Sequence, residues 1–214
     1  LRGRTITYKV YPLSFKEYLN FHNIELDKTK LTTQTISRIK NLFNRFLSEG
    51  GFPETISLDK DVRSKTLQDY FNVMIFKDLI ERYDIQQTSI LKYFCKRVIA
   101  NSSNEFSVNK IFNELKSQGY KVSKDTLYEF QDNIESIYLS LFLPKYSNSV
   151  IKREFSQKKS YSIDTGFANA LDYKFYNDKP RQFENLIYLE LLKKGKELTY
   201  YKDNYECDFL TLDR

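Results

Sequence analysis

The amino-acid sequence predicts a mainly α-helical chain that ends in a small α/β part. Three observations lead to this prediction. Apolar residues recur at three- and four-residue steps through several long segments. A helix-turn-helix pattern is followed by two short segments rich in β-formers. A last apolar helix then precedes two more segments of the same kind, and the 214 residues can hold one large domain or two small ones.

Composition restricts the classes of protein that the chain can represent. Hydrophobic residues make up 41% and charged residues 29% of the sequence, which suits a folded domain with a polar surface. No apolar run reaches the roughly 18–20 residues of a membrane-spanning helix, so we expect a cytoplasmic protein without a membrane partner. The net charge of +6 permits an anionic partner, nucleic acid above all, although a solvated lysine-rich surface gives the same value.

Several catalytic classes lack the residues that they need. The chain has one histidine, His22, and two distant cysteines, Cys95 and Cys207. Histidine-rich zinc sites, Ser-His-Asp triads and paired-cysteine sites are therefore not expected, and a reduced compartment is favoured. The sequence contains neither GxxxxGK[ST] nor GxGxxG. We therefore expect no ATP-hydrolysing site within this chain.

The first predicted elements are short. Residues 5–10 alternate β-forming and polar side chains, which predicts a strand that Pro12 ends. Ser14 and Glu17 have the spacing of a capping box, so a helix is expected near residues 14–21.

Three amphipathic helices are predicted next, over residues 33–48, 62–83 and 88–100. The first is expected to end at Gly50-Gly51, because glycine favours the backbone conformation that closes a helix. Cys95 lies on the apolar stripe of the third helix and is expected in the core rather than as a reactive thiol.

A winged-helix-like unit is predicted after these helices. One helix is expected over residues 108–118, and Ser123 is placed to cap a second one. Two strands near residues 138–143 and 159–163 follow, separated by a basic, polar loop. A helix, a turn, a second helix and then a hairpin is the order of a winged helix.

The charges of this unit argue against sequence-specific reading of DNA. The outward residues of its second helix are acidic and would repel phosphates, whereas the turn and the loop are basic. We expect contact with the nucleic-acid backbone through the loop, or packing against another protein. The acidic residues are Asp125, Glu129, Asp132 and Glu135, and the basic ones are Lys121, Lys124, Lys145, Lys152, Arg153, Lys158 and Lys159.

The C-terminal region is expected to form the small α/β part. Residues 166–180 lack a periodic pattern and are predicted to be irregular. An apolar helix over residues 181–194 precedes two strands over residues 198–202 and 205–212, joined by the turn Asp203-Asn204. The last strand has no later partner and the first residue is not methionine, so we expect a chain that is cut at both ends.

Three carboxylates in this region form the candidate metal site. Glu184 projects from an apolar helical stripe, where a carboxylate needs a partner, a metal or a shifted pKa. Glu206 and Asp208 lie two residues apart on a strand and share one face. Such oxygen ligands suit Mg²⁺ or Mn²⁺, which can activate water for phosphodiester hydrolysis. Two alternatives stay open: Glu184 stabilises its helix N-terminus, and the strand carboxylates form an ordinary polar face.

The order of several loose motifs resembles the C-terminal region of a prokaryotic AAA+-type P-loop ATPase family. In that family the end of the ATPase core is followed by a domain of unknown function with a PD-(D/E)xK nuclease-like part. The motifs are Leu1-Arg-Gly-Arg-Thr5, Val10–Tyr18, Ser48-Glu-Gly-Gly-Phe-Pro-Glu54, Phe76–Tyr83, Tyr161–Gly166, Phe183–Leu192 and Tyr200–Phe209.

The resemblance implies a parent ATPase that uses ATP and Mg²⁺, with its N-terminal core as the missing partner of this fragment. Arg4 would then contact nucleotide in the intact protein. Glu184 and Asp208 would be catalytic and metal-binding residues of the nuclease-like part, with Glu206 as a further metal ligand. The strand that carries the (D/E)xK residues would lie beyond Arg214, so the fragment is expected to be inactive by itself.

The predicted domains follow from these observations. Residues 1–30 would end the ATPase core, residues 31–160 would form the helical region with the winged-helix-like unit, and residues 161–214 would form a truncated restriction-endonuclease-like α/β domain. The predicted function is a DNA-associated accessory region of an ATP-binding protein. The alternatives are a metal-dependent nuclease and a protein-interaction module that regulates the ATPase, with the oligomeric state left open.

Overall fold

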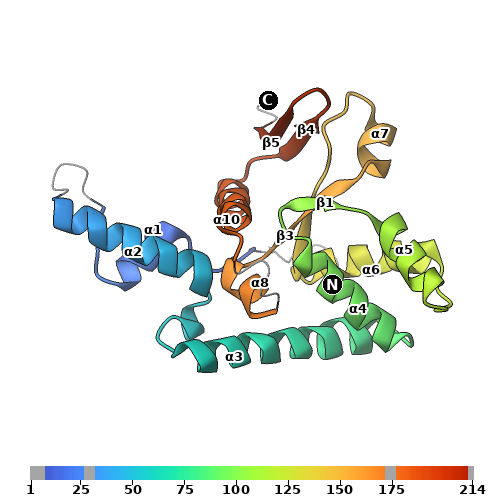
Figure 1. Cartoon of the computed structure of the whole chain (residues 1–214), viewed down its shortest axis with the longest axis horizontal. Helices are drawn as coiled ribbons and strands as arrows, with labels where there is room; N and C mark the ends of the chain where they lie inside the picture. The colour runs from blue at the N-terminus through green and yellow to red at the C-terminus, as the bar shows by residue number, and fades with distance from the viewer. Residues whose placement is uncertain (1–7, 27–31, 172–176, 212–214) are drawn as a thin grey trace, which may run out of the picture.

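The computed structural model describes residues 8–26, 32–171 and 177–211, and it is mainly helical with two small antiparallel sheets (Figure 1). The prediction of a mainly α-helical chain with a small α/β part is confirmed. The elements in chain order are α1 (Phe15–Phe21), α2 (Thr33–Glu49), η1 (Pro53–Thr55), α3 (Lys60–Val73), η2 (Met74–Glu81), α4 (Thr88–Ala100), β1 (Asn104–Phe106), α5 (Val108–Ser117), α6 (Lys124–Ser136), β2 (Ser140–Leu143), α7 (Val150–Phe155), β3 (Lys158–Ser162), α8 (Thr165–Leu171), α10 (Lys179–Lys193), β4 (Leu198–Lys202) and β5 (Glu206–Thr211).

Local signals in the sequence account for most helix ends. Ser14 and Glu17 form the predicted capping box of α1. Ser107 and Ser123 accept hydrogen bonds from the backbone at the starts of α5 and α6. Gly50 closes α2 with a φ of +81°, a conformation that glycine adopts without strain.

Four parts of the chain differ from the sequence prediction. Residues 8–10 carry no strand, and the rest of the predicted strand lies outside the described residues. The helix over residues 62–83 is α-helical only to Val73 and continues as the π-helix η2. Part of the region expected to be irregular forms α8. The three-residue β1 and the six-residue α7 were not predicted, because elements this short have too few residues to show a period.

The larger sheet has the strand order β1-β3-β2, with both pairs antiparallel. The smaller sheet is the hairpin of β4 and β5. The backbone of Tyr200 in β4 joins the two sheets, because its N–H donates to Pro144 and its carbonyl accepts from Tyr146. The hairpin therefore lies beside the connection between β2 and β3, as Figure 1 shows.

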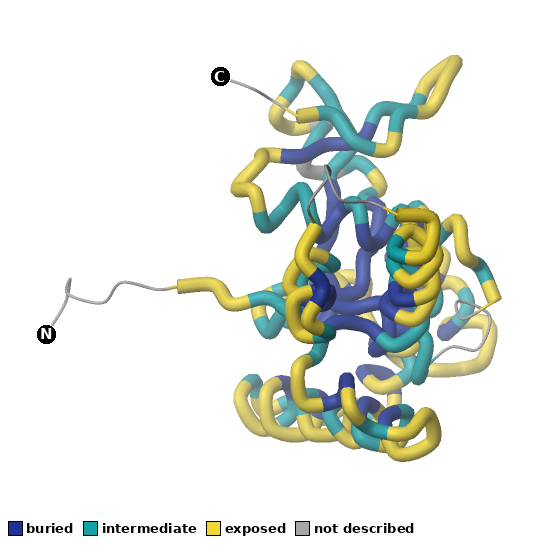
Figure 2. Tube along the Cα trace, turned by 90° about the vertical axis from the view of Figure 1, so that its left-hand side faces the viewer, coloured by how far each residue is buried: buried dark blue, intermediate teal, exposed yellow. Residues whose placement is uncertain are grey.

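Buried apolar side chains form three clusters in the middle of the molecule (Figure 2). The largest joins α3, η2 and α4 to α5, α6 and α8. A second joins α1 and α2 to α10, and a third joins the two sheets to α10. Cys95 is fully buried in the largest cluster, as predicted. Within the described residues, no helix is both long and apolar enough to span a membrane.

A buried carboxylate connects the end of α2 to the start of α8. Asp164 accepts hydrogen bonds from the backbone N–H groups of Gly51 at 2.6 Å and Phe167 at 2.8 Å. Burial raises the pKa of Asp164, and these backbone hydrogen bonds oppose that rise. Gly166 packs directly on the backbone carbonyl of Glu49, so the two segments approach as closely as backbone allows.

We predict that Gly166→Ala destabilises the fold by about 3 kcal/mol, because its Cβ would overlap the carbonyl of Glu49 and the clash involves backbone on both sides. Gly119→Ala is the control. Its Cβ would meet open space, so only the positive φ is strained and the cost should be about 1 kcal/mol. Urea unfolding of both variants measures the difference, and equal costs would contradict the prediction.

Candidate functional site

Lys159 in β3 lies at the centre of a cluster of three carboxylates. Its Nζ is 2.6 Å from Asp208 Oδ1, 2.9 Å from Glu206 Oε1 and 3.2 Å from Glu184 Oε1. The lysine side chain is 4% exposed, whereas Glu206 and Asp208 are 42% and 48% exposed. The ammonium is thus buried beneath carboxylates that face solvent.

Three elements bring these side chains together. Glu206 and Asp208 alternate with Cys207 along β5, so both face Lys159. Glu184 comes from the second turn of α10, beyond the first turn in which a carboxylate would stabilise the helix N-terminus. Tyr161, which shares a face of β3 with Lys159, donates its hydroxyl to Glu184 at 2.8 Å.

Burial and hydrogen bonding set the protonation of the cluster. Burial lowers the pKa of Lys159, but the hydrogen bonds to Asp208 and Glu206 outweigh this effect and hold it above its ordinary value. The hydrogen bond from Lys159 lowers the pKa of Glu206. Burial raises the pKa of Glu184, and the hydrogen bonds from Tyr161 and Lys159 oppose the rise. The ammonium therefore stays charged at neutral pH.

The cluster lines an open cavity of about 610 Å³. Lys202 lies on the other side of Glu206, at 3.5 Å, and also pairs with Glu105 at 3.2 Å. The cavity is lined by three cationic and four anionic side chains, which leaves a net charge of −1 that favours cations. These side chains are Lys159, Arg181, Lys202, Glu105, Glu184, Glu206 and Asp208.

Arg181 at the rim has a structural role. Its guanidinium donates to the carbonyls of Ala100 and Ser102 at the end of α4. A cation at this position satisfies carbonyls that the helix leaves unpaired. Ser103 completes the contact by donating its hydroxyl to the carbonyl of Arg181 at 2.8 Å.

The structure therefore brings together the three carboxylates that the sequence singled out, Glu184, Glu206 and Asp208. Arg4, the expected nucleotide contact, lies outside the described residues. Sequence reasoning missed Lys159 as the partner of all three. Its alternation with Tyr161 on a strand was the available signal, because that spacing places the two side chains on one face of the strand.

The donor set can be tested against a divalent cation. Three carboxylates offer the hard oxygen ligands that Mg²⁺ and Mn²⁺ prefer. As the side chains lie, no group of three or more His, Cys, Asp or Glu within the described ranges is arranged to hold a metal ion. The ammonium of Lys159 instead takes the central position. The donor atoms are of the kind that such an ion prefers, but in this structure Lys159 occupies the position between them.

A second concave surface lies between α6 and the connection from β2 to β3, with a volume of about 400 Å³. Asp125, Tyr128 and Asp132 of α6 line one side, and Lys158 lines the other. Two of the four acidic residues expected on the outer face of this helix, Asp125 and Asp132, thus border this groove. The connection is held in place by the hydroxyl of Tyr200, which donates to the carbonyl of Gln157 at 2.7 Å.

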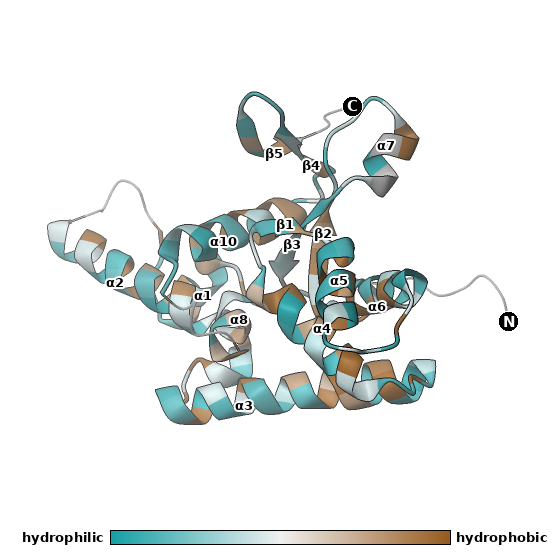
Figure 3. Ribbon diagram, turned by 45° about the vertical axis from the view of Figure 1, so that its right-hand side comes forward, coloured by the Kyte–Doolittle hydropathy of each residue, from teal (hydrophilic) through white to brown (hydrophobic). Residues whose placement is uncertain are grey.

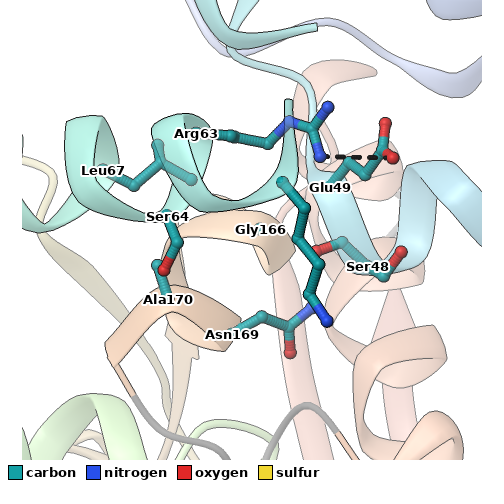
Figure 4. Close-up of a pocket in the computed structure, with 9 residues that line it drawn as sticks. Ser48, Glu49, Arg63, Ser64, Leu67, Gly166, Asn169 and Ala170 are labelled. Atoms are coloured by element: carbon teal, nitrogen blue, oxygen red, sulfur yellow. Dashed lines mark hydrogen bonds and ion pairs between the residues drawn. The ribbon is translucent and has the colours of Figure 1, made fainter. Parts of the chain in front are cut away.

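A smaller cavity of about 150 Å³ lies beside Arg63 (Figure 4). Arg63 donates to the carbonyl of Thr55 at 3.0 Å and pairs with Glu49 at 3.2 Å. Asn169 across the cavity donates to the carbonyls of Leu47 and Ser48. These polar groups hold the end of α2 against α3 and α8, which gives them a structural role.

Comparison with known proteins places these features in a family. The family described as Domain of unknown function (DUF8612) matches residues 40–178. The uncharacterized protein MJ1544 of Methanocaldococcus jannaschii is 34% identical over 216 residues, which cover 98% of this chain and 48% of the relative. An uncharacterized protein of Haemophilus influenzae is 26% identical over 211 residues, which cover 98% of this chain and 51% of the relative. The chain thus spans about half the length of the curated relatives it matches, and no solved structure matches it.

These findings correct the family expected from the sequence. The match is to a domain of unknown function and to uncharacterized proteins, so the predicted membership in an AAA+-type ATPase family is wrong. The expectations of ATP with Mg²⁺ in a parent ATPase, and of an ATPase core as partner, are not tested by these matches. The motifs around Gly51 and Asp164 have a structural explanation, because these residues join α2 to α8.

We predict that Lys159→Met lowers the free energy of unfolding at neutral pH by about 1–3 kcal/mol, because three carboxylates lose their shared cation and two of them are screened by solvent. Lys202→Met removes a half-exposed lysine from the same cavity and should lower the free energy of unfolding less than Lys159→Met does, because solvent screens its ion pairs. Urea unfolding measures both.

The difference in the free energy of unfolding between the wild type and Lys159→Met should depend on pH. The folded pKa of Glu206 is lowered, so its stabilising effect is fully present above the unfolded pKa of about 4.3 and is lost as pH falls through the folded value. The difference between the wild type and Lys159→Met should therefore shrink in this acidic range. A difference that stays constant there would show that the ion pair with Glu206 does not contribute.

Proposed function

The chain belongs to the family described as Domain of unknown function (DUF8612), and we propose that it is a nuclease-like module whose cavity around Lys159 binds a divalent cation for phosphodiester chemistry on nucleic acid. The convergence of Glu184, Glu206 and Asp208 on one ammonium in an open cavity carries this proposal. The ammonium marks the point at which these carboxylates already hold a positive charge. An oxygen donor set with a net negative charge suits Mg²⁺ or Mn²⁺.

The chain's own residues have defined tasks in this proposal. A bound divalent ion would activate water for attack on a phosphodiester. Tyr161 fixes the orientation of Glu184 through its hydrogen bond. Lys159 neutralises the carboxylates, and a bound metal ion would have to displace its ammonium from them. Lys202 keeps a positive charge at the rim that favours a phosphate.

Titration with Mn²⁺ by calorimetry tests the proposal. Wild-type protein should bind Mn²⁺, and Lys159→Met should bind it about tenfold more tightly or better, because the competing ammonium is gone. Asp208→Asn and Glu184→Gln should lose binding. Glu197→Gln changes an exposed carboxylate just before β4 and is the matched control. The absence of Mn²⁺ binding in both the wild type and Lys159→Met would refute the metal site.

Cleavage of labelled DNA in Mn²⁺ then tests the reaction itself. Activity that Asp208→Asn abolishes and Glu197→Gln retains would support a nuclease. Metal binding without cleavage would restrict the proposal to a cation site.

The second candidate function is nucleic-acid association without catalysis, and the topology of one unit favours it. Helix α4, strand β1, helices α5 and α6, and the antiparallel pair of β2 and β3 come in the order of a winged helix, with the short helix α7 inserted between β2 and β3. Lys121 and Lys124 lie at the N-terminal end of α6, where the helix dipole also favours phosphate. The acidic residues Asp125 and Asp132 line the adjacent groove, so phosphate contact at the helix end is favoured over reading of bases.

We predict weak binding to duplex DNA, with a Kd of about 10⁻⁴–10⁻⁶ M that rises steeply with salt, as expected for backbone contacts. The double variant Lys121→Glu, Lys124→Glu should weaken binding about tenfold or more and reduce the salt dependence. Lys40→Glu alters an exposed lysine on α2, far along the chain from this unit, and serves as the control. Fluorescence anisotropy measures all three proteins, and equal binding by the double variant would exclude the helix end as the contact.

A further inference from the structure

The outer side of the continuous helix formed by α3 and η2 is open to solvent and partly apolar. This helix is the lowest element in Figure 1, and Figure 3 shows hydrophobic residues recurring along it. Val73 is 50% exposed and Phe76 is 55% exposed, while Phe71 and Ile75 on the inner side are buried in the largest core cluster. Two exposed apolar side chains next to each other on an otherwise charged helix indicate an interaction surface.

Charged residues lie in a row with Val73, on both sides of it along the helix. Positions four residues apart along a helix lie on one face, and here they are Lys65, Asp69, Val73, Lys77 and Glu81, all exposed. The signs read positive, negative, neutral, positive, negative. Within the part of the chain that the structure describes, no ion pair is recorded for these four charged residues.

The order of the signs is self-complementary. Asp69 and Lys77 lie four residues on either side of Val73, and they carry opposite charges. Lys65 and Glu81 lie eight residues on either side and also carry opposite charges. If a second copy of the helix runs antiparallel with its Val73 opposite this Val73, every charge on the row meets its opposite. A two-fold axis requires this kind of relation, in which residue i meets j and j meets i.

Phe76 lies three residues after Val73 and adds an exposed ring beside this row. Tyr70, three residues before Val73, is turned toward the core, where its ring packs edge-on against Phe52. Phe76 belongs to the π-helical part, and π-helical turns are frequent at functional positions. Val73 at the axis would meet its own copy.

We propose that this helix face binds the same face of a second copy of the chain, antiparallel and centred on Val73. The alternative is a solvated helix whose lysines pair with acids four residues away on the same copy, Lys65 with Asp69 and Lys77 with Glu81. The two arrangements differ in what a charge reversal does to the association state.

Sedimentation of the whole chain over a concentration series tests the pairing. The wild type should form dimers. Lys77→Glu places two glutamates opposite Asp69 residues in each dimer and should raise the dimer Kd about tenfold. The double variant Asp69→Lys, Lys77→Glu swaps the charges and should restore the Kd to within about threefold of the wild type.

Lys110→Glu on α5 reverses another exposed helical lysine and should leave the Kd unchanged. Circular dichroism of every variant confirms that the helices are folded. A wild type that is monomeric at all concentrations overturns the proposal. So does a charge swap that fails to restore association in a folded variant.

Disulfide cross-linking tests the register independently. Cys95 is buried, and Cys207→Ser removes the partly exposed thiol. In that background Val73→Cys should form a cross-linked dimer under mild oxidation, because a residue on the axis lies next to its own copy. Lys110→Cys in the same background should not. Equal cross-linking of the two, or none at position 73, contradicts a two-fold axis at Val73.

Discussion

The C-terminal part of the molecule depends on the buried ammonium of Lys159. A charge removed from water is stable only if opposite charges compensate it, and here three carboxylates do so. Lys159 belongs to the three-stranded sheet, whereas its partners belong to α10 and to the terminal hairpin. The same electrostatic requirement therefore determines where the hairpin lies and which side chains face the cavity.

Tyr200 reinforces this arrangement from the other strand of the hairpin. Its backbone pairs with the connection after β2, and its hydroxyl contacts both Gln157 and Glu105. The connection between β2 and β3 is therefore bound by Tyr200 near both of its ends, at Pro144 and Tyr146 and at Gln157. The same residue thus links this connection to the hairpin that carries two of the three carboxylates.

Elements with local signals could be predicted, and contacts between distant residues could not. The helices α2, α4, α5 and α6 were found from their periodicity and their caps, such as Ser107 and Ser123. The two-residue spacing of Glu206 and Asp208 placed them on one face. Lys159 was missed because a lysine pair in a basic segment looks like solvated surface, and only residues 25 to 49 positions later bury it. The motifs around Gly51 and Asp164, on which the ATPase resemblance partly rested, consist of residues that pack closely and join α2 to α8. Such packing residues carry no information about nucleotide binding.

The hydrogen bond between Asp164 and Gly51 also has a consequence for the order of folding. The two residues are 113 positions apart, so the contact closes a long loop and can form only after the intervening segment has been made. Until α8 emerges from the ribosome, the end of α2 lacks the carboxylate that binds its backbone. The apolar faces of α1 and α2 can pack on each other earlier, so only the anchoring of the end of α2 has to await this later segment.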